Sequence, residues 1–163
     1  MTPVTETIFP MITYRVIARH ELDTISVWIW FLHEYSRGWV SAEEVSAFNQ
    51  IIRAEYMVGA FAENGRKLIG AGCVTRHASP DSVDSGELWL ADFVVIPEYK
   101  KSLLVDFQLY QMCMAFAQTL SGRILMSAKS EQVCQLMHKL GWVDVRNTMD
   151  QMDVLTTVLE FPR

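Results

Sequence analysis

The sequence is poor in cysteine, and its three cysteines show no pairing or metal-binding pattern. Cys73, Cys113 and Cys134 lie far apart, their number is odd, and each stands among apolar residues. No CxxC pair and no Cys/His spacing typical of a zinc site occurs. We therefore expect buried, reduced thiols in a cytoplasmic protein, with neither a disulfide framework nor a metal site.

An excess of basic residues is also missing, because the formal net charge is −5. General nucleic-acid binding needs a basic surface, so a nucleic-acid partner is not expected. No apolar stretch reaches the roughly 20 residues that span a bilayer, and residues 1–10 lack the basic and apolar segments of a signal peptide. The sequence thus predicts no membrane partner and a cytoplasmic location.

Hydrophobic residues, by contrast, are plentiful. They make up 50% of the 163 residues, against 20% for charged residues, which is typical of a folded globular chain. This length suits one domain with one sizeable core. We expect a single domain over 1–163, with 1–11 as an N-terminal extension.

Hydrophobic periodicity predicts a mixed sheet with helices. Strands are expected over 13–18, 56–62, 67–76, 87–96, 123–128, 142–145 and 152–159. Two helices are expected over 20–35 and 41–53. A third follows the basic turn and ends at Leu120, and a fourth runs over 131–140 after the cap residue Ser130. The third helix is apolar nearly all round, which predicts cover on more than one side, and Asn64-Gly65 predicts a hairpin. The fold class is α/β, of the mixed α+β type, in the order β-α-α-β-β-β-α-β-α-β-β.

The stretch 87–120 joins a strand to a helix through a short basic turn. The strand is followed by Pro97, and Lys100 and Lys101 stand before the apolar helix. The start of a helix presents free N–H groups and a partial positive charge, so phosphate binds well there. From the residues alone, a solvated basic edge is the other open interpretation.

Three stretches resemble, in order, motifs of the GNAT superfamily of acyl-CoA-dependent N-acyltransferases. They are 56–72 (YMVGAFAENGRKLIGAG), similar to the family's hairpin, 92–100 (DFVVIPEYK), similar to its acyl-CoA-binding strand and turn, and 136–142 (LMHKLGW), similar to its late "LYxKxGF" segment. The hairpin match rests on Gly65, Ile69 and Gly70, with one extra residue between them. The resemblance covers about 13–159. It implies the GNAT fold, a mostly antiparallel sheet whose fourth and fifth strands are parallel and splayed.

The resemblance also implies acetyl-CoA as co-substrate, held where the two parallel strands splay apart. Pantetheine would pair with the backbone of the fourth strand, and pyrophosphate would lie on the amides at the start of the third helix. The residues this implies are Phe93, Val94 and Val95 on the strand, Lys100, Lys101, Ser102, Leu103, Leu104 and Val105 in the turn, and Ser130 at the family's later Asn position.

Two departures from the family pattern bear on function. The family's turn reads (Q/R)-x-x-G-x-(G/A), but Leu103 and Val105 occupy its glycine positions, and their side chains would narrow the phosphate site. The family's Tyr acid corresponds to Met137, which has no proton to donate. Tyr110 and His138 are candidate substitutes, although helical spacing places Tyr110 on a core stripe and His138 on an outer face.

A general base would have to reach the incoming amine, and Asp92 and Glu87 are the candidates. An acid within a buried strand is costly unless it is paired, which makes Asp92 the better one; a hydrogen-bonded structural acid is the alternative. By resemblance, the first helix and the loop after the third strand often border the substrate, so His33, Glu34 and His77 are further candidates.

Two functions remain open from the sequence. The first is an N-acetyltransferase in which the amine of a small molecule or protein attacks acetyl-CoA directly, without a covalent enzyme intermediate or a metal. The second is a catalytically degenerate GNAT-fold protein with a binding or structural role, for example phage virion-associated or host-directed, with a protein partner or as a homo-oligomer. The strand, proline and basic turn favour the first function, whereas the missing glycines and Tyr favour the second.

Overall fold

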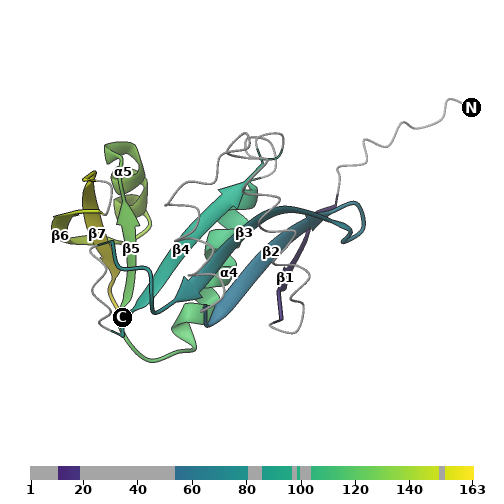
Figure 1. Ribbon diagram of the computed structural model, residues 1–163, viewed down its shortest axis with the longest axis horizontal. Coiled ribbons are helices and arrows are strands. Elements are labelled where there is room, and N and C mark those ends of the chain that lie inside the picture. The colour runs from purple at the N-terminus through teal and green to yellow at the C-terminus, as the bar shows by residue number, and fades with distance from the viewer. Residues whose placement is uncertain (1–10, 19–53, 81–85, 97–98, 100–103, 151–152) are drawn as a thin grey trace, which may run out of the picture.

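Seven strands form one sheet, in the order β1-β2-β3-β4-β5-β7-β6 (Figure 1). The computed structural model describes residues 11–18, 54–80, 86–96, 99, 104–150 and 153–163, without the side chains of residues 92 and 94. Its elements are β1 (Thr13–Val16), β2 (Tyr56–Ala62), β3 (Lys67–Thr75), β4 (Leu88–Val95), α4 (Val105–Gln118), β5 (Ile124–Ala128), α5 (Glu131–Lys139), β6 (Val143–Met149) and β7 (Leu155–Phe161). Adjacent strands are antiparallel except β4 and β5, which are parallel, and this confirms the predicted fold class.

The seven predicted strands occur in the predicted order, with the largest shifts in the last two. The sixth strand extends to Met149 instead of ending at residue 145, and the seventh runs from Leu155 to Phe161 instead of over 152–159. The polar residues Arg146, Asn147 and Thr148 concealed the length of β6, which lies at the sheet edge, where polar side chains are tolerated. The helices predicted over 20–35 and 41–53 lie outside the described residues.

The hairpin between β2 and β3 turns where the sequence predicted it. Glu63, Asn64 and Gly65 all have positive φ angles, of 53°, 58° and 82°. Asn and Gly adopt this conformation more readily than other residues. The turn therefore fixes which residues of β2 and β3 face each other.

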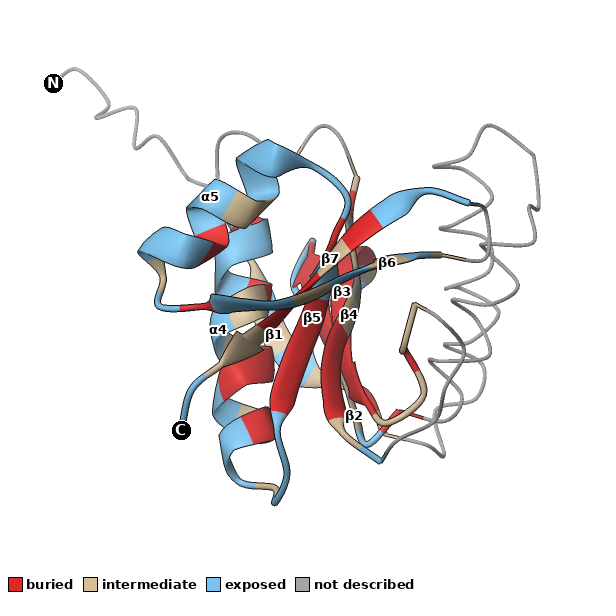
Figure 2. Cartoon of the chain, turned by 90° about the vertical axis from the view of Figure 1, so that its left-hand side faces the viewer, coloured by how far each residue is buried: buried red, intermediate tan, exposed pale blue. Residues whose placement is uncertain are grey.

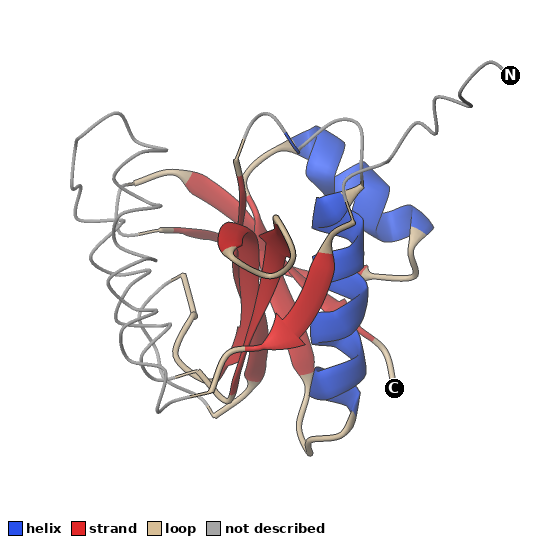
Figure 3. Cartoon of the chain, turned by 90° about the vertical axis from the view of Figure 1, so that its right-hand side faces the viewer, coloured by secondary structure: helices blue, strands red, loops and turns tan. Residues whose placement is uncertain are grey.

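Helices α4 and α5 lie on the same face of the sheet (Figures 2 and 3). Alternate residues of β4 point to opposite faces. Leu88 and Leu90 belong to the large core cluster beneath α4, whereas Trp89 belongs to a smaller cluster with Leu125 and Val158. The two-sided burial explains why β4 is an almost continuous apolar run in the sequence.

The prediction that α4 is covered on more than one side is wrong. Its buried residues, Val105, Leu109, Cys113, Met114 and Ala117, form one face toward the sheet. Phe107, which stacks on Tyr110, still has 39% of its surface exposed. Apolar residues at the margins of the buried face made the helix look buried all round. Among the described residues, no helix has the length and apolar character needed to cross a membrane.

None of the three cysteines takes part in a disulfide, and Cys73 and Cys113 are buried, as expected. Cys73 lies in β3 and Cys113 in α4, and burial raises the pKa of the Cys113 thiol to about 12. Because of this raised pKa, the Cys113 thiol is protonated at neutral pH and serves as a core residue. Cys134 is only partly buried, which differs from the expectation that all three thiols are buried.

Candidate functional site

Strands β4 and β5 start side by side and then diverge (Figure 1). Their parallel ladder joins Leu88 to Ile124 and Trp89 to Leu125. Beyond these pairs β4 continues to Val95 and β5 to Ala128, each still bonded to its other neighbour, β3 or β7. This divergence, called the splay below, was predicted. It leaves backbone groups on two facing strand edges for a ligand to pair with.

A β-bulge in β4 lies within the splay. Ala71 of β3 pairs with Val94 and Cys73 pairs with Ala91, so Asp92 and Phe93 together face the single residue Gly72. A bulge bends its strand and re-aims side chains, and such features are frequent beside active sites. The candidate base Asp92 is thus in the irregular part of β4.

The three predicted pantetheine-binding residues of β4 all lie beyond its last pair with β5. Phe93 is partly buried against the core beneath α4, and Val95 is buried in that core. The side chains of Phe93 and Val95 therefore serve packing, and a ligand contact of these two residues would use only their backbone. That contact stays a prediction.

The helix that follows the basic turn begins in an unusual way. Leu104, its N-cap residue, is left-handed with φ 50°, makes no side-chain capping hydrogen bond, and has 66% of its surface exposed. The amides of the first helical residues, starting with Val105, have no acceptor within the helix. They can therefore bind an anion. Lys100, Lys101, Ser102 and Leu103 lie outside the described residues.

Val105 does not obstruct this helix start. Its side chain is fully buried in the core between α4 and the sheet. The expectation that a side chain at this glycine position would narrow the phosphate site is therefore wrong for Val105. The chain avoids a clash there by turning the side chain inward.

Ser130 caps α5, as predicted, because its Oγ accepts a hydrogen bond of 3.2 Å from the backbone N–H of Val133. The residue follows β5 closely and is exposed. Its predicted contact with acetyl-CoA remains untested.

Both candidate substitutes for the family's acid, Tyr110 and His138, have a side-chain hydrogen-bond partner, and Met137 has no proton to donate. Met137 is buried in the core, with 7% of its surface exposed. The Tyr110 hydroxyl accepts a 2.7 Å hydrogen bond from Trp142 Nε1, and burial raises the tyrosine pKa while this bond lowers it. His138 Nε2 lies 2.7 Å from Asp144 Oδ1 at the surface.

Tyr110 lines an open groove of about 350 Å³ on α4, together with Phe107, Met114 and other residues of that helix. Leu140 at the end of α5 and Phe161 at the end of β7 border the same groove. The expectation that Tyr110 lies on a core stripe is met only in part, since it is half-buried. His138 lies on the outer face of α5, as expected.

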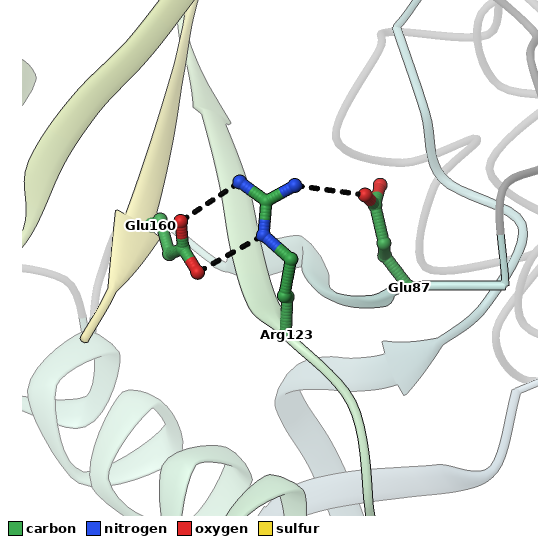
Figure 4. A network of polar contacts seen from close by, with 3 residues as sticks. All are labelled: Glu87, Arg123 and Glu160. Carbon is green, nitrogen blue, oxygen red and sulfur yellow. Dashed lines mark hydrogen bonds and ion pairs between the residues drawn. The ribbon is translucent and has the colours of Figure 1, made fainter. Parts of the chain in front are cut away.

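Glu87 lies at the opposite end of β4 from the basic turn. Its carboxylate accepts a 3.1 Å hydrogen bond from Arg123 Nη1, and Arg123 also holds Glu160 (Figure 4). Sequence reasoning missed Arg123 and Glu160. The signal was a pair of opposite charges, Glu87 and Arg123, each directly before the apolar run of a parallel strand.

Of the remaining base candidates, His77, His33 and Glu34, the structure describes only His77. The backbone N–H of His77 donates to Thr75 Oγ1 at 3.2 Å, and its side chain is half-buried just after β3. His33 and Glu34 lie outside the described residues. Both of the main assignments, Asp92 and Glu87, stay predictions.

Comparison with known proteins identifies the fold. No protein-family model and no curated protein matches the sequence. Among solved structures, an aminoglycoside 6'-N-acetyltransferase complexed with coenzyme A is 12% identical over 93% of this chain and 98% of its own, with a TM-score of 0.65. FeeM, an N-acyl amino acid synthase from uncultured soil microbes, is 16% identical over 94% and 91%, with a TM-score of 0.63. A GNAT-family acetyltransferase from Staphylococcus aureus Mu50 is 11% identical over 93% and 100%, with a TM-score of 0.60.

At these identities the similarity concerns the fold alone. The chain has the GNAT fold, as the three sequence stretches indicated. The splay and the helix that follows β4 are parts of this fold.

Proposed function

We propose that this protein transfers an acetyl group from acetyl-CoA to an amine. The observation that carries the proposal is the splay, where β4 has no strand partner on its β5 side beyond Trp89 among the described residues, and leads to the start of α4. A fold shared with acyltransferases does not by itself establish activity. The proposal therefore rests on how the residues of the splay suit the ligand.

Acetyl-CoA fits the described residues at two points. The β4 edge beyond Trp89 is suited to pairing with the amide groups of pantetheine, because strand edges bind extended chains through backbone hydrogen bonds. The first amides of α4 suit the pyrophosphate, and the inward side chain of Val105 keeps that surface open. Lys100 would add a charge-assisted contact.

In this proposal acetyl-CoA supplies the activated thioester, and Asp92 receives a proton from the attacking amine, directly or through water. Its position at the bulge of β4 supports this role. Met137 has no proton for the leaving thiolate, so water would supply it. Transfer should therefore be slow, since a positioned general acid contributes about 10²–10⁴-fold.

Calorimetric titration with acetyl-CoA and CoA, combined with acetyl transfer to a panel of amines, tests the proposal. Asp92→Asn should abolish most of the transfer while CoA still binds. Asp153→Asn is the matched control, because Asp153 is an exposed acid in the turn before β7. Equal loss in both variants, or none in Asp92→Asn, would reject Asp92 as the base.

Lys100→Ala provides a test of the phosphate site. It should weaken CoA binding about five- to tenfold, as expected for a lost charge-assisted hydrogen bond of about 1 kcal/mol or more. Lys139→Ala, at an exposed lysine in the last turn of α5, should leave the affinity unchanged. Unchanged affinity in both variants removes the role proposed for Lys100.

The second candidate is a GNAT-fold protein without catalysis that binds a protein partner or a second copy of itself. The buried Met137 at the position of the family's acid favours it. Absence of both CoA binding and acetyl transfer in the wild type would decide for this candidate and against the enzyme.

A further inference from the structure

Arg123 connects three strands at the closed end of the splay (Figure 4). Its Nη1 donates to Glu87 Oε1 at 3.1 Å, while Nε and Nη2 donate to the two carboxylate oxygens of Glu160 at 3.0 and 2.8 Å. Glu87 directly precedes β4, Arg123 directly precedes β5, and Glu160 lies in β7. The guanidinium therefore spans β4, β5 and β7 at the point where β4 and β5 are still paired.

The two halves of this network join strand pairs of very different strength. β5 and β7 are paired along the whole of β5, from Ile124↔Phe161 to Ala128↔Thr157. β4 and β5 share only the pairs Leu88↔Ile124 and Trp89↔Leu125. The Glu87–Arg123 contact therefore reinforces the weaker pair, and it stands directly before the first of its two ladder positions.

The Glu160 contact sets the direction of the guanidinium. A bidentate Arg–carboxylate pair fixes the plane of the side chain. Hydrogen bonding to Arg123 lowers the pKa of the Glu160 carboxyl, and the same bonds raise the pKa of Arg123. Both groups are therefore charged at neutral pH, and Nη1 is held toward Glu87.

A second arginine ties the same end of the splay. Arg76, just after β3, donates from Nη1 to the Gly86 carbonyl at 2.6 Å and from Nη2 to the Ser121 carbonyl at 3.3 Å. Hydrogen bonds of Arg76 and of Arg123 thus each connect residues 86–87 with residues 121–123. Both connections lie where β4 and β5 are still paired, before the two strands diverge.

We propose that Glu87 and Arg123 form a clamp that fixes the closed end of the splay and so sets the spacing of the strands that hold acyl-CoA. The inference rests on the proposed function. Two strands that diverge from one fixed point keep a defined separation further along, and loosening that point would displace the β4 edge on which pantetheine pairs. Glu87 is then a positioning residue that acts through Arg123, and not the general base.

The first test needs no ligand. The amide of Leu88 donates to the Arg123 carbonyl at 2.9 Å, so its hydrogen exchange reports opening of the closed end. Arg123→Gln and Glu87→Gln should each accelerate this exchange about fivefold, the equilibrium change for an exposed ion pair at the upper end of its usual strength. Asp144→Asn, which removes the surface pair with His138, is the matched control and should leave Leu88 unchanged.

Global unfolding should hardly change in these variants, because 47% of the Arg123 side chain is exposed and exposed pairs contribute little. A faster Leu88 exchange without a matching drop in melting temperature therefore indicates local opening. Unchanged Leu88 exchange in both clamp variants overturns the proposal.

The second test measures coenzyme A affinity and turnover. Both variants remove the Glu87–Arg123 contact, and Arg123→Gln also removes the pair with Glu160. Glu87→Gln should raise the Kd for CoA about fivefold, Arg123→Gln should raise it at least as much, and the double variant should raise it no further than Arg123→Gln alone. Arg123→Lys keeps the charge but loses the forked guanidinium, so its Kd for CoA should lie between those of the wild type and Arg123→Gln.

The alternatives give different results. If Glu87 is the base, Glu87→Gln lowers kcat without changing the CoA affinity, and Arg123→Gln does not reproduce it. Faster Leu88 exchange with unchanged CoA affinity refutes the role in spacing the cofactor strands. A wild type that binds no CoA refutes the proposed function, and the cofactor role of the clamp with it, whatever the exchange result.

Discussion

The ring of Phe93 lies against the backbone of Gly72, so close that a Cβ atom added to Gly72 would lie 2.7 Å from two ring carbons. The same Cβ would lie 3.4 Å from Cys113 Sγ of α4. Gly72 is also the residue that faces both Asp92 and Phe93 across the bulge. The absence of a side chain at residue 72 thus lets Phe93 pack under α4 and allows the irregular backbone of β4 that carries Asp92.

Gly72→Ala should therefore destabilise the protein by about 1–3 kcal/mol, as expected for overpacking in a core. Phe93→Leu removes the ring that the new methyl group meets, so Gly72→Ala should cost less in that background. Denaturant unfolding of the two single variants and the double variant measures this coupling. Strictly additive effects would show that the Phe93 ring is not what excludes a side chain from residue 72.

Leu104→Gly should stabilise the protein by about 1 kcal/mol. The left-handed conformation costs a residue with a Cβ roughly 1–2 kcal/mol and costs glycine almost none, which outweighs the greater freedom of glycine in the unfolded chain. Little packing is lost, because the Leu104 side chain is largely exposed. Leu104→Ala is the control, since it shortens the side chain but keeps the strain, and it should bring no gain. A loss of stability in Leu104→Gly would contradict the left-handed assignment.

Tyr110→Phe should reduce stability and leave acetyl transfer per folded molecule unchanged. The variant deprives the buried Trp142 indole of the hydroxyl that accepts its 2.7 Å hydrogen bond, which costs about 1–3 kcal/mol. Tyr14→Phe is the comparison, at a half-buried tyrosine of β1 whose pKa is also raised by burial, and should cost less. Loss of turnover with unchanged unfolding would instead make Tyr110 the missing acid.

The sequence was sufficient to place the seven strands in order, because their signals are local. The apolar run of β4 and the Asn64-Gly65 turn each specify backbone geometry within a few residues. The parallel pairing of β4 and β5 came from the family resemblance, which fixes which strands are neighbours.

The features that the sequence could not predict depend on register and on strain. Arg123 and Glu160 lie 37 positions apart, and their contact exists because β5 and β7 pair with Leu125 opposite Glu160. Leucine is disfavoured in the left-handed conformation, so no propensity indicates Leu104. The side chain of Val105 points into the core because α4 starts at this residue. The family's turn motif gives only the positions of the glycines, so it does not predict where the helix starts.

Met137→Tyr should raise the rate of acetyl transfer if acetyl-CoA binds as proposed, because it supplies a proton donor at the position where the family carries its Tyr. The expected gain is about tenfold or more, below the full contribution of a positioned acid, since the site did not evolve around the hydroxyl. Met137 is buried, so the larger ring should also cost about 1–3 kcal/mol of stability.

Met137→Phe is the matched control for this variant, because it brings the same ring and the same overpacking without the hydroxyl. A higher turnover in the Tyr variant than in the Phe variant, at equal CoA affinity and similar melting temperature, isolates the proton donor. Equal rates in the two variants would show that residue 137 does not reach the leaving sulfur. Fast transfer by the wild type would show that another group already protonates the thiolate, and that Met137 is no deficiency.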